Sequence, residues 1–264
     1  MKKITVIGIG IIFCYLSVSA QVERTFFIGL GGGGSTFQDV KFSTNQYRGT
    51  GGIFDFGYTR QRVHSKLAAY CAINFGSESA ATHDKGNTFV LNPRLGVQYL
   101  RNIQSKFWLG GRWNIMDLYI RNIDGLGNNS VYYIGSSQLF LSGEYEYQKL
   151  NFGCALGLLA FQKESTSFAF SAPQNGLEDG EFGYQNEALD DLFGFKYYQF
   201  KPIWQQLSLR THVIYNLNER INIGYQWQMR RFAEVENYPV TYGIHSVVIR
   251  FNMVKKGTIA PLNE

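Results

Sequence analysis

Hydrophobic and polar residues alternate along most of the chain from Gln21 onward. In the segment 87–100, one face collects large apolar side chains and the other collects polar groups and glycine. The apolar face holds Phe89, Leu91, Pro93, Leu95, Val97 and Tyr99, and the polar face holds Asn92, Arg94, Gly96 and Gln98. A period of two is the mark of a β-strand with two different faces. The pattern recurs in 131–147, 203–217 and 220–233, and no segment sustains a helical period, so we predict an all-β fold.

The alternation predicts ten strands, separated by connections of two kinds. The strands are 25–37, 47–60, 66–78, 87–100, 106–120, 131–147, 151–168, 203–217, 220–233 and 240–253. Each reaches the ~9–11 residues that a tilted strand needs to cross a bilayer. The short connections 61–65, 101–105, 148–150 and 218–219 alternate with longer ones, of which 169–202 is the longest. Short turns at one end and long external loops at the other are typical of antiparallel transmembrane β-barrels. We predict about ten strands, with eight or twelve as alternatives.

The same period would also fit a secreted soluble barrel or sandwich. Other features must therefore decide whether the apolar face points into the protein or outward to lipid. The polar faces consist mainly of Gly, Ser, Asn and Gln, without the lysine-rich surface of a soluble sheet. Charged residues make up only 17% of the chain, below the usual quarter, while hydrophobic residues are an ordinary 45%. Aromatic residues near the predicted strand ends suit interfacial girdles; they are Tyr58, Tyr99, Trp108, Tyr119, Tyr145, Tyr147, Trp204, Tyr215, Tyr238 and Tyr242. These features favour a membrane barrel with its apolar face on lipid.

The N-terminus has the features of an export signal. Lys2 and Lys3 precede the apolar run 4–18, which ends at Ser19 and Ala20. This order predicts a secretory signal peptide cleaved after Ala20, with a buried strand or membrane anchor as the alternative. The expected organisation is therefore a signal peptide at 1–20, an outer-membrane barrel at 21–254 and a short periplasmic tail at 255–264. The net charge of +5 is scattered along the chain, which argues against nucleic-acid binding.

The last predicted strand carries Val247, Ile249 and Phe251 on one face. With the ten alternating segments and the short turns, this strand makes the chain resemble the small outer-membrane β-barrel proteins of Gram-negative bacteria, from Gln21 to about Met253. The resemblance implies the cell outer membrane as the location and its lipid as the surroundings. The aromatic-ended strand looks like the signal that barrel-assembly machinery recognises in this class. The chain departs from the pattern in its polar tail, which follows the aromatic residue.

If the apolar faces meet lipid, the polar faces point into the lumen. The inward set that we expect to form a polar network is Asp55, Arg94, Arg112, Gln138, Glu144, Glu146, Arg210, His212, Gln226, Arg230 and Arg250. Barrels of eight strands are filled by their side chains, and water channels appear near sixteen. An unpaired buried charge is costly, so these groups should pair and fill the space. A narrow, porin-like passage that prefers anions is the alternative.

His212 is the candidate for catalysis. It is predicted to face inward near Ser208 and close to Glu144 or Glu146, and a Ser–His–carboxylate set would allow acyl hydrolysis. A lone lumen histidine is more often a hydrogen-bonded packing group, so whether the protein is an enzyme stays open, and a role without catalysis is favoured.

No cofactor or metal site is predicted. The run from Gly29 to Gly34 fits G-x-G-x-x-G, but no helix follows it to bind a pyrophosphate. In a barrel such glycines let the sheet bend. Cys71 and Cys154 fall on lipid faces of strands that are not neighbours, so neither a disulfide nor a metal spacing is expected.

The predicted loop 169–202 is rich in carboxylates and has aromatic residues near its end. It is the surface through which other envelope proteins could bind. The expected function is an outer-membrane β-barrel with a structural or interaction role, presenting loops or serving as a subunit of an envelope complex. A narrow passive pore for small solutes is one alternative, and a barrel hydrolase acting on envelope lipid or protein is another.

Overall fold

The computed structural model describes residues 21–39, 46–80, 83–125, 128–170, 198–233 and 239–258. These residues form eleven strands joined by turns: β1 (Gln21–Asp39), β2 (Tyr47–Gln61), β3 (Ser65–Ala80), β4 (His83–Gln104), β5 (Phe107–Gly125), β6 (Asn128–Tyr147), β7 (Leu150–Phe170), β8 (Gln199–Pro202), β9 (Gln206–Asn216), β10 (Ile221–Ala233) and β11 (Pro239–Thr258). In this part of the chain no helix is long and apolar enough to span a membrane. The prediction of an all-β fold is confirmed.

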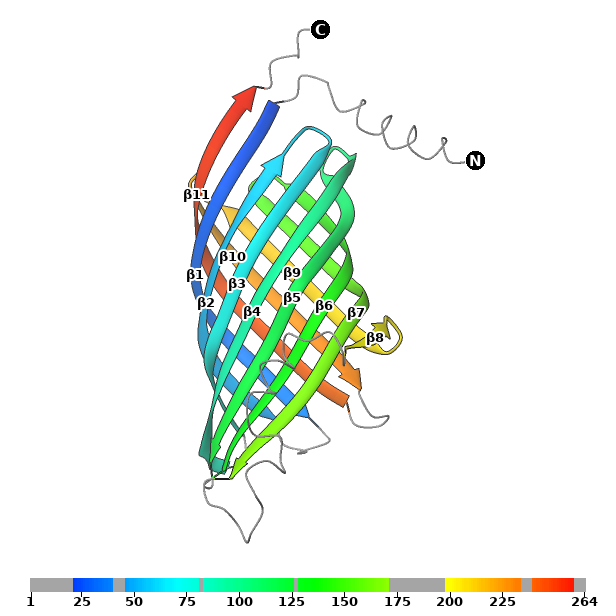
Figure 1. Cartoon of the computed structure of the whole chain (residues 1–264). Coiled ribbons are helices and arrows are strands. Elements are labelled where there is room, and N and C mark those ends of the chain that lie inside the picture. Colours follow the sequence, from blue (N-terminus) through cyan, green and yellow to red (C-terminus); the bar gives the residue numbers. More distant parts are fainter. Residues whose placement is uncertain are drawn as a thin grey trace, which may run out of the picture.

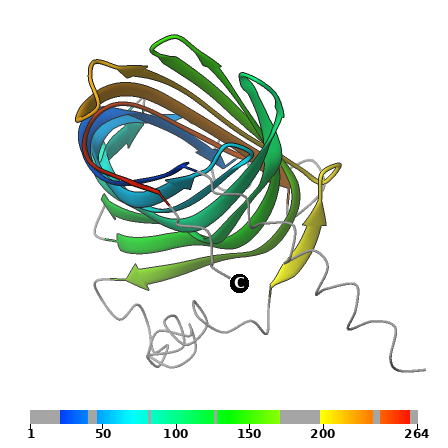
Figure 2. The same cartoon turned by 90° about the horizontal axis from the view of Figure 1, so that it is seen from above.

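The strands close into an antiparallel barrel (Figures 1 and 2). Ten of them form the ring, in the order β1, β2, β3, β4, β5, β6, β7, β9, β10 and β11, and β11 pairs with β1 from Gln21↔Thr258 to Asp39↔Val240. Among the described strands, the short β8 pairs only with β7, and it lies beside the ring in Figure 2. The predicted barrel of ten strands is therefore confirmed.

The eighth predicted strand, 203–217, starts later in the structure, as β9 at Gln206, and the short β8 lies in the segment predicted as the loop 169–202. Ile203–Gln205 form a turn between β8 and β9, and Gln205 N donates to Pro202 O at 2.9 Å. The turn places Trp204 outside the wall with 81% of its surface exposed. The sequence itself marks this boundary, because Ile203 and Trp204 are both apolar and Gln205 and Gln206 are both polar, so the alternation starts only at Gln206.

The barrel has two distinct ends. The turns 62–64, 105–106, 148–149 and 217–220 lie at the same end as residues 21 and 258, and we call this the terminal end; the opposite end is the loop end (Figure 1). Toward the loop end, β4, β5 and β6 run further than predicted, so residues 83–86, 122–125 and 128–130 belong to strands where loops were expected. Backbone hydrogen bonding does not need apolar side chains, so pairing continues past the apolar part of each strand. β11 likewise continues to Thr258.

The outer wall is apolar, as the predicted faces require. Phe26, Ile28 and Leu30 of β1 are 44–56% exposed, and Val247, Ile249 and Phe251 of β11 are 43–52% exposed. A band of this kind is stable against the hydrocarbon of a membrane, the reverse of a soluble barrel.

Only some of the aromatic residues predicted to form interfacial girdles lie on the outer surface of the barrel. Tyr99, Tyr145, Tyr147 and Tyr215 are exposed near the terminal end of their strands. In contrast, Trp108, Tyr119 and Tyr242 are buried inside the barrel, so the prediction was wrong for these three. Trp108, for example, lies opposite the inward Glu144, and residues paired across neighbouring strands share a face. Tyr238 lies outside the described residues.

Glycine allows close strand packing between β1 and β11 and between β2 and β3. A Cβ at Gly33 would overlap the carbonyl oxygen of His245 on β11, and one at Gly51 would overlap that of Phe75 on β3. Strands that curve this tightly leave no room for inward side chains. The glycine-rich motif 29–34 thus lies within β1 and shapes the wall.

Candidate functional site in the barrel lumen

The structure places all eleven predicted lumen residues on the inner face, but it divides them between two environments. Asp55, Glu144, Glu146, His212, Gln226 and Arg250 line the cavities at the terminal end, together with Arg94, Arg112 and Arg210 at the cavity floor. Gln138 and Arg230 lie beyond that floor, inside a dense polar cluster.

Two adjoining cavities occupy the terminal half. The outer one has a volume of about 380 Å³ and is lined by mouth residues such as Glu23 and Asn252. The inner one has a volume of about 170 Å³ and shares Phe27, Thr59 and Arg250 with the outer one. The interior of this half is therefore hollow.

Ion pairs cross the walls of these cavities. Arg250 Nη2 donates to Asp55 Oδ2 at 2.6 Å, and Lys66 Nζ donates to Glu144 Oε2 at 2.5 Å. Glu146 lies 3.7 Å from the same lysine. The Arg250 and Lys66 side chains keep 18% and 15% of their surface exposed, so these pairs stay in contact with cavity space.

His212 takes part in a packing arrangement and not in a catalytic set. Its Nε2 lies 3.3 Å from Asn151 Oδ1, and Asn151 Nδ2 donates to Glu144 Oε2 at 3.2 Å. The ring fills the space beside Gly153, where a Cβ would overlap it. Ser208 is four residues away on the same strand, roughly 13 Å at the rise of a β-strand, and its hydroxyl bonds to Gln138 at 3.1 Å. The structure does not bring Ser208, His212 and a carboxylate together.

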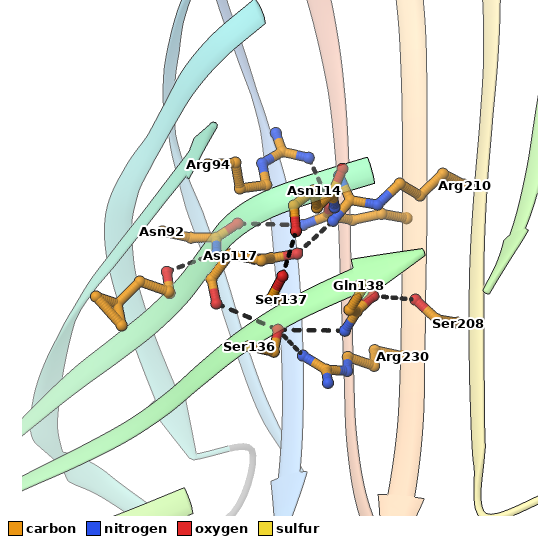
Figure 3. Close-up of polar contacts among 12 residues, drawn as sticks. Asn92, Arg94, Asn114, Asp117, Ser136, Ser137, Gln138, Ser208, Arg210 and Arg230 are labelled. Atoms are coloured by element: carbon orange, nitrogen blue, oxygen red, sulfur yellow. Dashed lines mark hydrogen bonds and ion pairs between the residues drawn. The ribbon is translucent and has the colours of Figure 1, made fainter. Parts of the chain in front are cut away.

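A polar plug crosses the middle of the lumen (Figure 3). At its centre, Asp117 accepts from Asn92 Nδ2 at 3.0 Å and forms an ion pair with Arg210. Gln228 Nε2 donates to Asn92 Oδ1 at 3.2 Å, and Gln228 Oε1 accepts from Arg94 Nη1 at 2.5 Å. All five side chains are more than nine-tenths buried.

A second part of the plug lies beside this centre. Arg230 donates to Ser136 Oγ at 2.7 Å and to Gln162 Oε1 at 2.5 Å. Gln138 lies between Arg230 and Ser208. A guanidinium can only donate, so the amide oxygen of Gln138 belongs on its side, where it lies 2.6–2.8 Å from the Arg230 nitrogens; the amide nitrogen then donates to Ser208 Oγ at 3.1 Å.

The plug joins strands that face each other across the barrel. β4 and β10 lie five places apart in the ring of ten, and Gln228 of β10 bonds to both Arg94 and Asn92 of β4. Side chains from opposite walls thus meet in direct hydrogen bonds across the lumen. This is the observation on which the functional conclusion depends.

An aromatic layer follows the plug toward the loop end. Tyr119 of β5 stacks on Phe37 of β1 at 5.5 Å and on Tyr242 of β11 at 4.8 Å between ring centroids. Its hydroxyl donates to Glu78 at 3.3 Å, and Glu78 also pairs with Arg121 at 3.4 Å. The remaining buried members of the cluster are Val90, Ile134, Phe232 and Val240. This layer is a second closure, built from apolar contact.

Asp117, the central carboxylate of the plug, is absent from the predicted set because β5 contains a bulge. Asn114 pairs with Gln138 and Asp117 pairs with Ser136, so β5 has one extra residue between them. A bulge reverses the alternation beyond it. Residues 112 and 114 face inward before it, and residues 117, 119 and 121 face inward after it, which also explains why Tyr119 is buried.

Lys66 and Glu78 are also missing from the predicted set, although both have the inward parity of Asn74 on β3. Extending the alternation to the two ends of that strand would have found them.

The structure brings no metal-binding group together within the described segments: no three His, Cys, Asp or Glu side chains are close enough to share an ion. Cys71 and Cys154 are free thiols, on outward positions of β3 and β7.

Comparison with known proteins identifies the fold. No protein-family model matches the sequence, and no curated protein matches it significantly. Among solved structures, the translocator domain of the autotransporter NalP from Neisseria meningitidis has a TM-score of 0.54 at 12% identity, with 94% of each chain covered. The outer membrane protease OmpT from Escherichia coli scores 0.48 at 8% identity, covering 90% of this chain and 99% of that one. Neisserial surface protein A scores 0.33 at 10% identity, with 86% and 96% covered. At these identities the likeness concerns the fold alone. The match to the NalP translocator domain, together with the closed antiparallel barrel itself, confirms the architecture of an outer-membrane β-barrel.

Proposed function

We propose that this protein is an outer-membrane β-barrel with a closed lumen, and that it acts through the surfaces it presents, as a loop-bearing barrel or a subunit of an envelope complex. The observation that carries the proposal is the direct hydrogen bonding between β4 and β10 through Arg94, Asn92 and Gln228. A barrel built to conduct solutes would keep opposite walls apart.

The two closures differ in chemistry, which strengthens the case. Opening the plug would leave guanidinium groups buried without partners, at a cost of several kcal/mol for each uncompensated charge. Opening the aromatic layer would require Tyr119 to leave contacts on two sides. A passive pore needs neither arrangement.

The outer-membrane location is supported by the apolar band, which needs lipid, and by the fold. The signal sequence 1–20 lies outside the described residues, and cleavage after Ala20 is part of the proposal. A hydrolase is less well supported, because Ser208 is engaged by Gln138 and lies far from His212 along β9.

For partners, the proposal extends to other envelope proteins that bind through the segment 169–202, of which residues 171–197 lie outside the described part. The test is purification of the tagged protein from native membranes in mild detergent, followed by native electrophoresis. We expect the full chain to migrate in a complex larger than the barrel.

The matched variant replaces residues 171–197 by a Gly/Ser linker of equal length, and it should migrate as the barrel alone. A full chain that also migrates alone from native membranes would contradict the interaction role.

A further inference from the structure

The inner cavity has more positive than negative groups in its wall. Five cationic side chains line it, against two carboxylates: the cations are Lys66, Arg94, Arg112, Arg210 and Arg250, and the carboxylates are Asp55 and Glu144. Both carboxylates are already used, by Arg250 and by Lys66. The three other arginines lie at the floor of the cavity. Arg210 is paired with Asp117 of the plug, so the excess positive charge belongs to Arg94 and Arg112.

Some donors of the floor arginines lack acceptors, although Arg210 is paired with Asp117. Within the described residues, the side chain of Arg94 donates only to the neutral amide of Gln228, and it has no carboxylate at ion-pair distance. Its Nε has no hydrogen-bond partner, and neither does Nη1 of Arg210. Both residues are more than nine-tenths buried, with exposed fractions of 7% and 8%. Buried guanidinium nitrogens without acceptors are costly, so a bound anion would relieve the site.

Arg112 is held in position to receive such an anion. Its Nε donates to Tyr70 Oη at 2.7 Å, and its guanidinium lies over the Tyr70 ring at 4.1 Å. The Tyr70 hydroxyl in turn donates to Asn114. These contacts use Nε and one face of the group, while its two terminal nitrogens have no hydrogen-bond acceptor among the described residues. A planar fork of free donors matches the oxygens of a carboxylate or phosphate.

From this geometry we propose that the inner cavity binds a small oxyanion, of phosphate or short carboxylate size, which enters from the terminal end. The cavity volume of about 170 Å³ is ample, since one water needs only about 10–15 Å³ of such space. The outer cavity of about 380 Å³ adjoins it and provides the path. The anion would rest on the floor arginines, with the plug behind them.

The test is isothermal titration calorimetry of the purified barrel in detergent at low ionic strength, with inorganic phosphate and, in parallel, malonate. We expect saturable binding of at least one of them to a single site. Arg112→Gln should weaken binding roughly tenfold or more, because it removes charge-assisted hydrogen bonds. Arg112→Lys, which keeps the charge and loses the fork, should fall between that variant and the unmodified protein.

The matched control is Arg101→Gln, which removes the same charge from an exposed position on β4 and should change affinity less than about twofold. Heat-modifiable electrophoretic migration verifies that each variant is folded, and Arg112→Lys keeps the test valid if Arg112→Gln is not. Absence of binding for both anions, or equal affinity in the unmodified protein and the folded Arg112 variants, would overturn the site. The inference does not depend on the closed lumen, so conduction by the barrel would contradict only the proposed function.

Discussion

The two halves of the lumen share one wall but differ in how their charges are held. In the terminal half, Arg250 pairs with Asp55 beside open cavity space. In the plug, Arg210 pairs with Asp117, whose side chain is only 1% exposed. The alternation of polar and apolar residues is the same in both halves, so alternation decides which residues face inward, and the size and reach of the side chains decide whether the lumen stays open.

The two halves also differ in whether water can hydrate an arginine whose carboxylate partner has been removed. Water in the terminal cavities can solvate a freed arginine. In the plug, the guanidinium of Arg230 is 2% exposed and is surrounded by protein groups that already have partners. The same substitution should therefore have unequal effects in the two halves.

The largest effect is expected for the plug carboxylate. Asp117→Ala should lower the free energy of unfolding by about 3–5 kcal/mol, since it leaves buried arginines uncompensated. Asp55→Ala removes the same group beside the cavity and should cost about 1 kcal/mol, because Arg250 can be hydrated. Urea titrations in lipid vesicles measure both values. Equal losses would show that the terminal half is as dry as the plug.

A smaller difference is expected for aromatic residues. Tyr119→Ala should cost about 3 kcal/mol, because it opens a cavity within the stacked layer. Phe27→Ala, at the wall shared by both terminal cavities, should cost about 1 kcal/mol, since the space next to Phe27 is already open. The same urea titrations apply. A larger loss for Phe27 than for Tyr119 would contradict the assignment of the closed half.

The sequence was sufficient for the barrel and for most of the inward residues, because a period of two assigns faces wherever a strand is regular. The assignment of inward and outward residues was wrong where a strand is irregular. The bulge before Asp117 reverses the faces of β5, and nothing in the local composition marks the extra residue. The turn at Ile203–Gln205 shortens the predicted strand 203–217, and here the sequence does mark the change, because two apolar residues are followed by two polar ones.

The contacts between opposite strands could not be predicted at all. Arg94 and Gln228 are 134 residues apart, and their meeting depends on strand number, tilt and register together. Alternation places both in the lumen but gives no information on whether they touch. The distinction between a filled and an open lumen therefore required the structure.

The closed lumen is tested most directly by single-channel recording in planar bilayers. The purified, heat-modifiable protein should give no discrete current steps at any applied voltage. The variant carrying Arg94→Ala, Gln228→Ala and Tyr119→Ala, which truncates both closures, should give steps under the same conditions and so proves insertion. Regular current steps from the unmodified protein would contradict the account.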